Sequence, residues 1–164
     1  MESTNQVAPP LDVDLNTIDT TLPLLEGGGK IYELVCAMVT PGLTKAGAPI
    51  LKLQLNTTEP SRSQDGRDLG PGIPVFENLN LAPSGKATWD MVARNIGAVV
   101  QGFGVQVQGT NFPEQLAYLT NNSQAILQGQ ICRCKVGIEP AGIDKNGKSF
   151  KAKNVIEVWL PKGK

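Results

Sequence analysis

The chain has no histidine, few aromatic residues and no long hydrophobic run. None of its 164 residues is His, and Phe, Trp and Tyr together make up 5% of them. Without an imidazole, a His-based catalytic triad, a histidine metal ligand and an imidazole general base are excluded. A membrane-spanning helix needs roughly 18 or more consecutive apolar residues, and no such run occurs. Residues 1–15 carry neither the basic nor the apolar region of a secretory signal, so we expect a cytoplasmic protein.

Cysteine is scarce as well, at three residues. An odd number of cysteines without a secretory signal indicates reduced thiols. Cys132 and Cys134 are two positions apart within an alternating segment, which predicts two small buried side chains on one face of a strand. Zinc binding is the alternative, but the chain offers neither a histidine nor a second close cysteine pair. No nucleotide-phosphate loop is present either, so we expect no metal, no other cofactor and no enzymatic activity.

The formal net charge is zero, but the charges are unevenly distributed. Residues 1–28 contain five acidic residues and no Lys or Arg, which leaves 15 basic and ten acidic residues in the remainder. Eight basic residues follow Gly129, against three acidic ones, and such a basic end indicates a polyanion as partner. Residues 1–29 lack periodicity and end in a glycine cluster. We interpret them as a flexible or loosely attached acidic arm before one domain, residues 30–164, on which Leu22, Leu24 and Leu25 are able to dock.

Three segments in the first half of the chain have the patterns of β-strands. Residues 30–40 are apolar on both faces, which predicts a long strand that is buried on both sides or shared between two sheets. Residues 50–57 and 75–81 alternate between apolar and polar side chains, so each is expected to bury one face. The outward-facing side chains of the second and third strands are then Lys52, Gln54, Asn56, Phe76, Asn78 and Asn80.

Two helices are predicted in the middle of the chain. Apolar side chains recur at helical spacing in residues 87–101, and Ser84 is a suitable N-cap for this helix. Residues 113–127 form a second, shorter helix that the pair Asn121–Asn122 is expected to disturb.

Residues 129–160 have the pattern of a β-hairpin with one apolar and one basic face. Apolar side chains recur at every second position of its two strands. The opposite faces and the linking loop carry Arg133, Lys135, Lys145, Lys148, Lys151, Lys153 and Trp159. A basic, partly aromatic sheet face suits a nucleic-acid groove. On its own, however, the hairpin pattern favours a solvated lysine face.

The order of these elements is three strands, a helical segment and two strands. This is the topology of the OB-fold, a five-stranded, partly open barrel that binds oligonucleotides on strands 2 and 3 and in adjoining loops. We therefore predict a mainly β, five-stranded OB-fold barrel with the helical segment between strands 3 and 4. The hairpin at 129–160 would form one wall of a groove, and strands 2 and 3 would form the other.

Four motifs occur in a fixed order: PILKLQLNTTEP, VFENLNL, a helix ending near GFGV, and LQGQICRCKVGIEP followed by KNGKSFKAKNVIEVWLP. This series resembles a family of small phage single-stranded DNA-binding proteins, long catalogued as a domain of unknown function. Its pattern Phe-x-x-hydrophobic-x-Leu is matched by Phe76, Leu79 and Leu81. The resemblance covers about residues 30–161, and the chain departs from it in a longer loop at 58–74 and in the atypical inter-helix stretch at 105–126. It implies a protein of phage DNA replication or recombination, located in the host bacterial cytoplasm.

The sequence therefore predicts a non-catalytic protein that binds single-stranded DNA without sequence preference, alongside other replication or recombination proteins. Basic side chains would neutralise phosphates and aromatic rings would stack on bases. The candidates are Lys52, Arg62, Arg67, Phe76, Arg133, Lys135, Lys145, Lys148, Lys151, Lys153 and Trp159, with Tyr32 and Phe150 as further aromatic candidates. Core packing is the alternative for each aromatic residue. A phage structural or accessory protein without nucleic-acid binding is the competing function, and RNA, duplex DNA and a homodimer all stay open.

Overall fold

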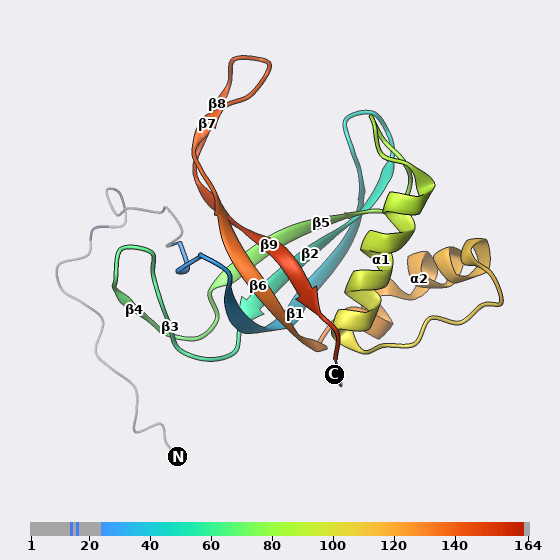
Figure 1. Ribbon diagram of the computed structural model, residues 1–164, viewed down its shortest axis with the longest axis horizontal. Coiled ribbons are helices and arrows are strands. Elements are labelled where there is room, and N and C mark those ends of the chain that lie inside the picture. The colour runs from blue at the N-terminus through green and yellow to red at the C-terminus, as the bar shows by residue number, and fades with distance from the viewer. Residues whose placement is uncertain (1–13, 15, 17–23, 163–164) are drawn as a thin grey trace.

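A curved, five-stranded antiparallel sheet and two helices make up most of the computed structural model, which describes Asp14, Asn16 and residues 24–162. The strands of the sheet follow the spatial order β5-β2-β1-β6-β9 (Figure 1). Their bounds are β1 Lys30–Leu43, β2 Pro49–Thr57, β5 Pro74–Asn80, β6 Ile131–Glu139 and β9 Lys153–Leu160. Two short hairpins lie outside this sheet: β3 Ser61–Arg62 with β4 Asp68–Leu69, and β7 Gly142–Ile143 with β8 Ser149–Phe150.

Strand β1 joins the two halves of the sheet. Residues 30–35 of β1 pair with β6, whereas residues 34–43 pair with β2. A β-bulge between Cys36 and Met38 interrupts the pairing with β2, and bulges bend a strand and increase its twist. The predicted long strand at 30–40 is therefore confirmed, and it joins the β2–β5 half and the β6–β9 half of one sheet. The prediction that this strand is buried on both sides or shared between two sheets is wrong, because its outer face carries the exposed Ile31 and Met38.

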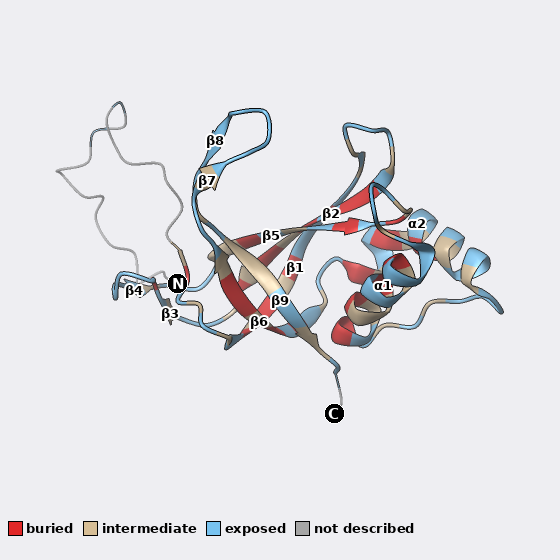
Figure 2. Ribbon diagram, turned by 45° about the horizontal axis from the view of Figure 1, so that its top comes forward, coloured by how far each residue is buried: buried red, intermediate tan, exposed pale blue. Residues whose placement is uncertain are grey.

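The apolar core lies on one side of the sheet, at the positions where the strands alternate. Leu51, Leu53 and Leu55 of β2 are buried, as are Cys132 and Cys134 of β6, which confirms the predicted alternation in both strands. Figure 2 shows buried segments along the strands of the sheet and mostly exposed residues on the two short hairpins. Burial raises the pKa of the Cys36 thiol to about 11, so the thiol stays protonated and unreactive at neutral pH.

The sheet is not closed into a barrel. Its two outer strands, β5 and β9, lie near each other, but no hydrogen-bonded ladder joins them among the described residues. The mainly β class, the five strands and the helical segment between the third and fourth of them are as predicted. The described strands themselves form a bent sheet with two edges.

Helix α1 (Trp89–Phe103) and helix α2 (Phe112–Leu127) lie at one end of the sheet (Figure 1). The predicted cap of α1 at Ser84 is wrong, because the Thr88 side chain accepts the hydrogen bond from the Met91 amide. Ser84 instead begins a turn, in which its carbonyl accepts from the amide of Ala87. The predicted disturbance of the second helix is confirmed, since Asn122 has non-helical backbone angles and kinks α2. Among the described residues, no helix has the length and apolar character needed to cross a bilayer.

A bulge in the last hairpin changes the face on which Trp159 lies. Lys135 pairs with Val158, but the next residue of β6, Val136, pairs with Ile156, so Glu157 has no partner across the ladder. The extra residue reverses the alternation, and Trp159 stands opposite the buried Cys134. Its indole packs 5.5 Å from the Phe103 ring of α1. The predicted basic face of residues 153–159 is therefore wrong for Trp159, which packs against the core.

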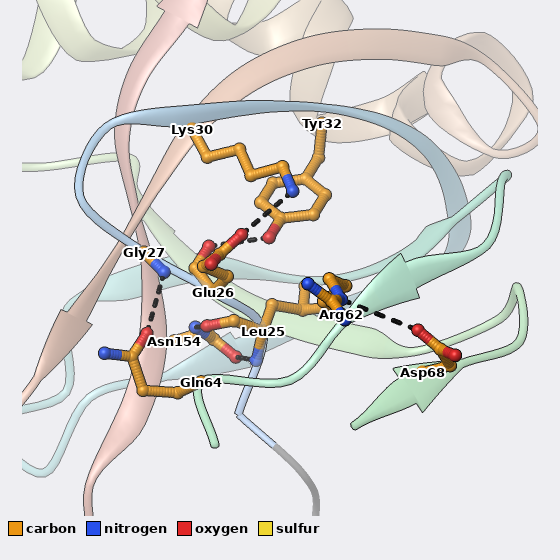
Figure 3. A network of polar contacts seen from close by, with 9 residues as sticks. All are labelled: Leu25, Glu26, Gly27, Lys30, Tyr32, Arg62, Gln64, Asp68 and Asn154. Carbon is orange, nitrogen blue, oxygen red and sulfur yellow. Dashed lines mark hydrogen bonds and ion pairs between the residues drawn. The ribbon is translucent and has the colours of Figure 1, made fainter. Parts of the chain in front are cut away.

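The segment from residue 24 to residue 27, which the sequence assigns to the N-terminal arm, is docked on the domain. Leu25 is fully buried, and its backbone forms two hydrogen bonds with the Asn154 side-chain amide, at 2.8 and 3.1 Å (Figure 3). The Glu26 amide donates to the carbonyl of Arg62. This is the docking that the leucines of the arm allow, and the flexibility predicted for residues 1–23 falls almost wholly outside the described residues.

Candidate nucleic-acid interface

The outer face of the sheet, opposite the core, contains a hollow of about 210 Å³ on β1, β2 and β5. The strand register builds it, because Met38 stands opposite Gln54, and Gln54 stands opposite Phe76. One step along the strands, Thr40 and Lys52 form the next row. The members of this set, which we call the β2–β5 hollow, are Met38, Thr40, Lys52, Gln54, Phe76 and Asn78, and the buried Leu53 also lines it.

Two large apolar side chains of the β2–β5 hollow are open to solvent. Phe76 is 57% exposed and Met38 is 53% exposed. An exposed ring flanked by a flexible thioether is an unfavourable arrangement in water but offers a stacking surface for a planar ligand. The side chains around the ring are polar and uncharged except for Lys52, which is exposed. The hollow therefore combines a stacking surface, amide hydrogen-bonding groups and one cation.

The amide groups of this face are held by the sheet. The side chain of Gln54 donates to that of Asn56 at 3.2 Å, and Asn78 stands opposite Lys52. Amides and lysine are suited to hydrogen bonds with base edges and phosphate oxygens. Because alternate residues on neighbouring strands point the same way, these groups all face outward with Phe76.

The β7–β8 hairpin places two of the predicted lysines beyond the end of the sheet. Its turn is closed by Asp144, whose carboxylate accepts from the backbone amides of Asn146 and Lys148, each at 2.9 Å. Lys145 and Lys148 are exposed on this turn. The β7–β8 hairpin and the β1–β2 connection project to the same side of the molecule (Figures 1 and 2). At the base of the hairpin, Lys151 is exposed and Lys153 lies 3.5 Å from Glu139.

The two predicted arginines of the long loop lie together on the β3–β4 hairpin. Arg62 contacts Asp68 at 3.5 Å, and Arg67 contacts Asp65 at 3.2 Å. Both pairs are exposed, so each contributes little to stability. The acidic partners offset the positive charge that the sequence assigns to this loop. The hairpin lies beside the docked N-terminal segment (Figure 3).

Arg133 and Lys135 lie on the outer face of β6, on the other half of the sheet. Arg133 pairs with Glu33 of β1, whereas Lys52 pairs with Thr40 of the same strand. Met38, the first member of the hollow on β1, lies five residues beyond Glu33, which is roughly 16 Å of extended chain, so Arg133 is separated from the β2–β5 hollow. The structure therefore does not bring the predicted basic residues into one groove.

The predicted aromatic residues also lie in different parts of the structure, and only some of them are exposed. Phe76 is exposed in the hollow, and Phe150 lies on the β7–β8 hairpin. Tyr32 is buried, and its hydroxyl donates to the carbonyl of Glu26 at 2.6 Å. Trp159 packs on Phe103. Packing is thus the role of Tyr32 and Trp159, and Phe76 is the aromatic residue available on the sheet for a ligand.

Sequence reasoning missed Met38 and Thr40 as members of the hollow. The amides Gln54 and Asn78 are expected on the outer face from strict alternation. Met38 is not, because the bulge after Cys36 shifts the alternation of β1 by one residue. The pairing of a long apolar strand with a following amphipathic strand gives no sign of where such a bulge falls.

The chain matches no family model and no curated protein. Among the described residues, no group of three or more His, Cys, Asp or Glu side chains is arranged to hold a metal ion.

Proposed function

We propose that this protein binds single-stranded DNA without sequence preference and without catalysing a reaction. The observation that carries the proposal is the β2–β5 hollow, where an exposed Phe76 and Met38 lie beside Lys52 and a set of amides. Stacking on an exposed aromatic ring stabilises a bound base by about 1–3 kcal/mol and tolerates any base. A duplex keeps its bases stacked on each other, so such a ring favours a single strand.

The fold supports the proposal through its strand order. We infer an OB-type arrangement, in which β1, β2, β5, β6 and β9 are the five strands and β5 approaches β9. The hollow then lies on the second and third strands of the fold, which is the face that OB-folds use for oligonucleotides. The β7–β8 hairpin corresponds to the connection between the fourth and fifth strands, which also contributes to binding in OB-folds.

In this mechanism the strand crosses the hollow and continues toward the β7–β8 hairpin. One base stacks on Phe76 against the Met38 thioether, and Lys52 neutralises a neighbouring phosphate. Lys145 and Lys148 contact the backbone further along the strand. Each neutralised phosphate releases counterions, so affinity falls as salt rises. The biological role that fits is the coating of exposed strands in phage DNA replication or recombination.

The second candidate is a structural or accessory protein that binds another protein through its surface. The exposure of Trp89 and Met91 on α1 favours it, because neither side chain is needed for nucleic-acid contacts. The two functions differ in one measurement, which is binding of a labelled single-stranded oligonucleotide.

The test is fluorescence anisotropy of labelled oligo-dT at about 50 and 200 mM salt. We expect binding that weakens with salt and is lost on Met38→Ala more than on Met91→Ala. Met91 is the matched control, since it is 51% exposed but lies on α1. Competition with unlabelled RNA and duplex DNA then ranks the three substrates. Absence of binding at low salt, or equal losses in the two methionine variants, would refute the proposed site.

A further inference from the structure

The β6–β9 half of the outer face carries aliphatic side chains, with Lys135 between two of them, in place of amides. Ile31, Lys135 and Val158 form one row across β1, β6 and β9. Ile31 is 42% exposed and Val158 is 43% exposed. In the same face, Ile131 of β6 stands opposite Val35 of β1 and is 40% exposed. These side chains point away from the core, and a row of exposed aliphatic groups indicates a surface that other protein covers.

Two opposite charges lie side by side in the middle of this aliphatic face. Glu33 and Arg133 are partners across β1 and β6, and Leu160 of β9 completes their row. The Glu33 carboxylate is held in place by the Thr58 hydroxyl, which donates to it at 2.6 Å. Glu33, Arg133 and Leu160 also line a hollow of about 310 Å³ at the edge of the face.

We propose that this face is the interface of a homodimer, in which a second copy of the chain packs across a two-fold axis. A two-fold axis presents the same patch on both subunits, so the patch must complement itself. Neighbouring opposite charges meet this requirement, because the axis sets Glu33 of each copy against Arg133 of the other. Aliphatic contacts surround the charges, and arginine is enriched in interface cores whereas most charged residues are depleted there.

The charge of the whole chain agrees with a second copy as the occupant. A strongly basic or acidic chain repels its own copies, but this chain has a formal net charge of zero. Arg133 and Lys135 on this face attract phosphate, but a nucleic acid is a poorer occupant than a protein, because Glu33 repels phosphate and aliphatic groups form no stacking surface for bases. The proposal is independent of the nucleic-acid function, since the β2–β5 hollow lies on the other half of the sheet.

Sedimentation velocity of the full chain over a concentration series tests the interface. We expect the wild type to dimerise by about 100 µM, and Glu33→Arg and Arg133→Glu each to weaken the dimer at least tenfold. Each variant places like charges opposite one another in its own dimer. An equimolar mixture of the two variants should restore a dimer, because a doubly basic face then meets a doubly acidic face.

The mixture distinguishes an interface from a structural role, since a folding defect in one variant is not repaired by adding another. Val158→Lys should also give a monomer, whereas Met91→Lys on α1 should leave the dimer intact. A thermal unfolding curve for each variant shows that it is folded. A wild type that is monomeric at every concentration, a dimer that survives all three interface changes, or a mixture that stays monomeric would each overturn the proposal. If Val158→Lys is monomeric but still binds oligo-dT, the loss of the dimer does not remove nucleic-acid binding. The dimer proposal and the nucleic-acid proposal are then tested separately.

Discussion

The two halves of the outer sheet face differ in chemistry although they share a strand. The β2–β5 half has an exposed ring, a thioether and amides around Lys52. The β6–β9 half has aliphatic side chains and Lys135 around the pair of Glu33 and Arg133. The first set is suited to a planar, anionic ligand, and the second is suited to another protein surface.

The change in chemistry follows the change in pairing along β1. Up to Val35 the strand pairs with β6, and its outward residues are Ile31, Glu33 and Val35. After the bulge, where β1 pairs with β2 alone, its outward residues are Met38 and Thr40. One long strand therefore supplies both surfaces, and the bulge at Cys36–Met38 marks the border between them. A bent sheet can thus present two surfaces of different composition on the two halves of one face, without a second domain.

The largest expected effect tests whether one core supports both halves. Leu25 is fully buried where the N-terminal segment meets β9. We expect Leu25→Ala to lower the free energy of unfolding by about 2–5 kcal/mol, because it removes buried surface and leaves a cavity. Chemical denaturation measures this. Leu43→Ala is the control, since that leucine is 67% exposed. Equal, small changes in both would show that the docked segment is not part of the common core.

The next effect concerns the ring of the β2–β5 half. Phe76→Ala should weaken oligo-dT binding by about 1–3 kcal/mol, since one stacking surface is lost. The free energy of unfolding of the Phe76→Ala variant should stay close to that of the wild type, because the ring is exposed. Anisotropy titrations beside a denaturation curve separate the two. If Val158→Lys reduced affinity by a similar amount, the assignment of different partners to the two halves would be wrong.

A smaller effect compares one lysine from each half. Lys52→Gln should lower the slope of log affinity against log salt by about 0.7, the value for one phosphate contact on a single strand. Lys135→Gln, on β6, should leave that slope unchanged. Titrations at four salt concentrations give both slopes. A larger change at Lys135 would mean that the hairpin at 129–160 contributes to the binding groove, as the sequence predicts for one of its two walls.

The smallest effect lies at the far edges of the two halves, where β5 approaches β9. Glu77 faces inward from β5, and burial raises the pKa of its carboxyl, although a hydrogen bond from the Asn78 backbone and the charge of Lys153 act in the opposite direction. A raised pKa in the folded state stabilises the fold below the ordinary pKa of the group. That contribution is lost as pH rises through the raised value.

Glu77→Gln should therefore leave the unfolding midpoint nearly unchanged at about pH 4 and raise it at about pH 7. Asp68→Asn is the control, because that carboxylate is exposed on the β3–β4 hairpin. A midpoint that rises equally at both pH values would mean that the carboxyl is not held in a buried environment between the two edge strands.

Much of the fold follows from the sequence because regular alternation reports burial directly. The alternating leucines of β2 and the cysteines of β6 locate two strands and their inner faces. The two helices are likewise found from their spacing, to within two residues at each end. Caps are less predictable, since Ser84 and Thr88 are both acceptable and the Gly85 turn, at a positive φ of 63°, decides between them.

The candidate site is less predictable because single-residue irregularities decide which side chains meet. The bulge at Glu157 reverses the alternation of β9 and turns Trp159 into the core. A list of basic residues also does not show which of them have acidic partners in the fold. Arg62 and Arg67 have acidic neighbours on their own hairpin. A sequence shows which residues alternate, but not where a register shifts.

The side chain of Asn154 bonds to the backbone of Leu25, 129 residues earlier in the chain. During synthesis, Leu25 leaves the ribosome long before its partner strand exists. Its apolar side chain then stays exposed until β9 has been synthesised and has paired with β6. Because contacts between distant residues form late, this junction should be the last part of the domain to assemble. A nascent chain that ends before Asn154 would expose Leu25 and the unfinished sheet edge to chaperones and to other chains.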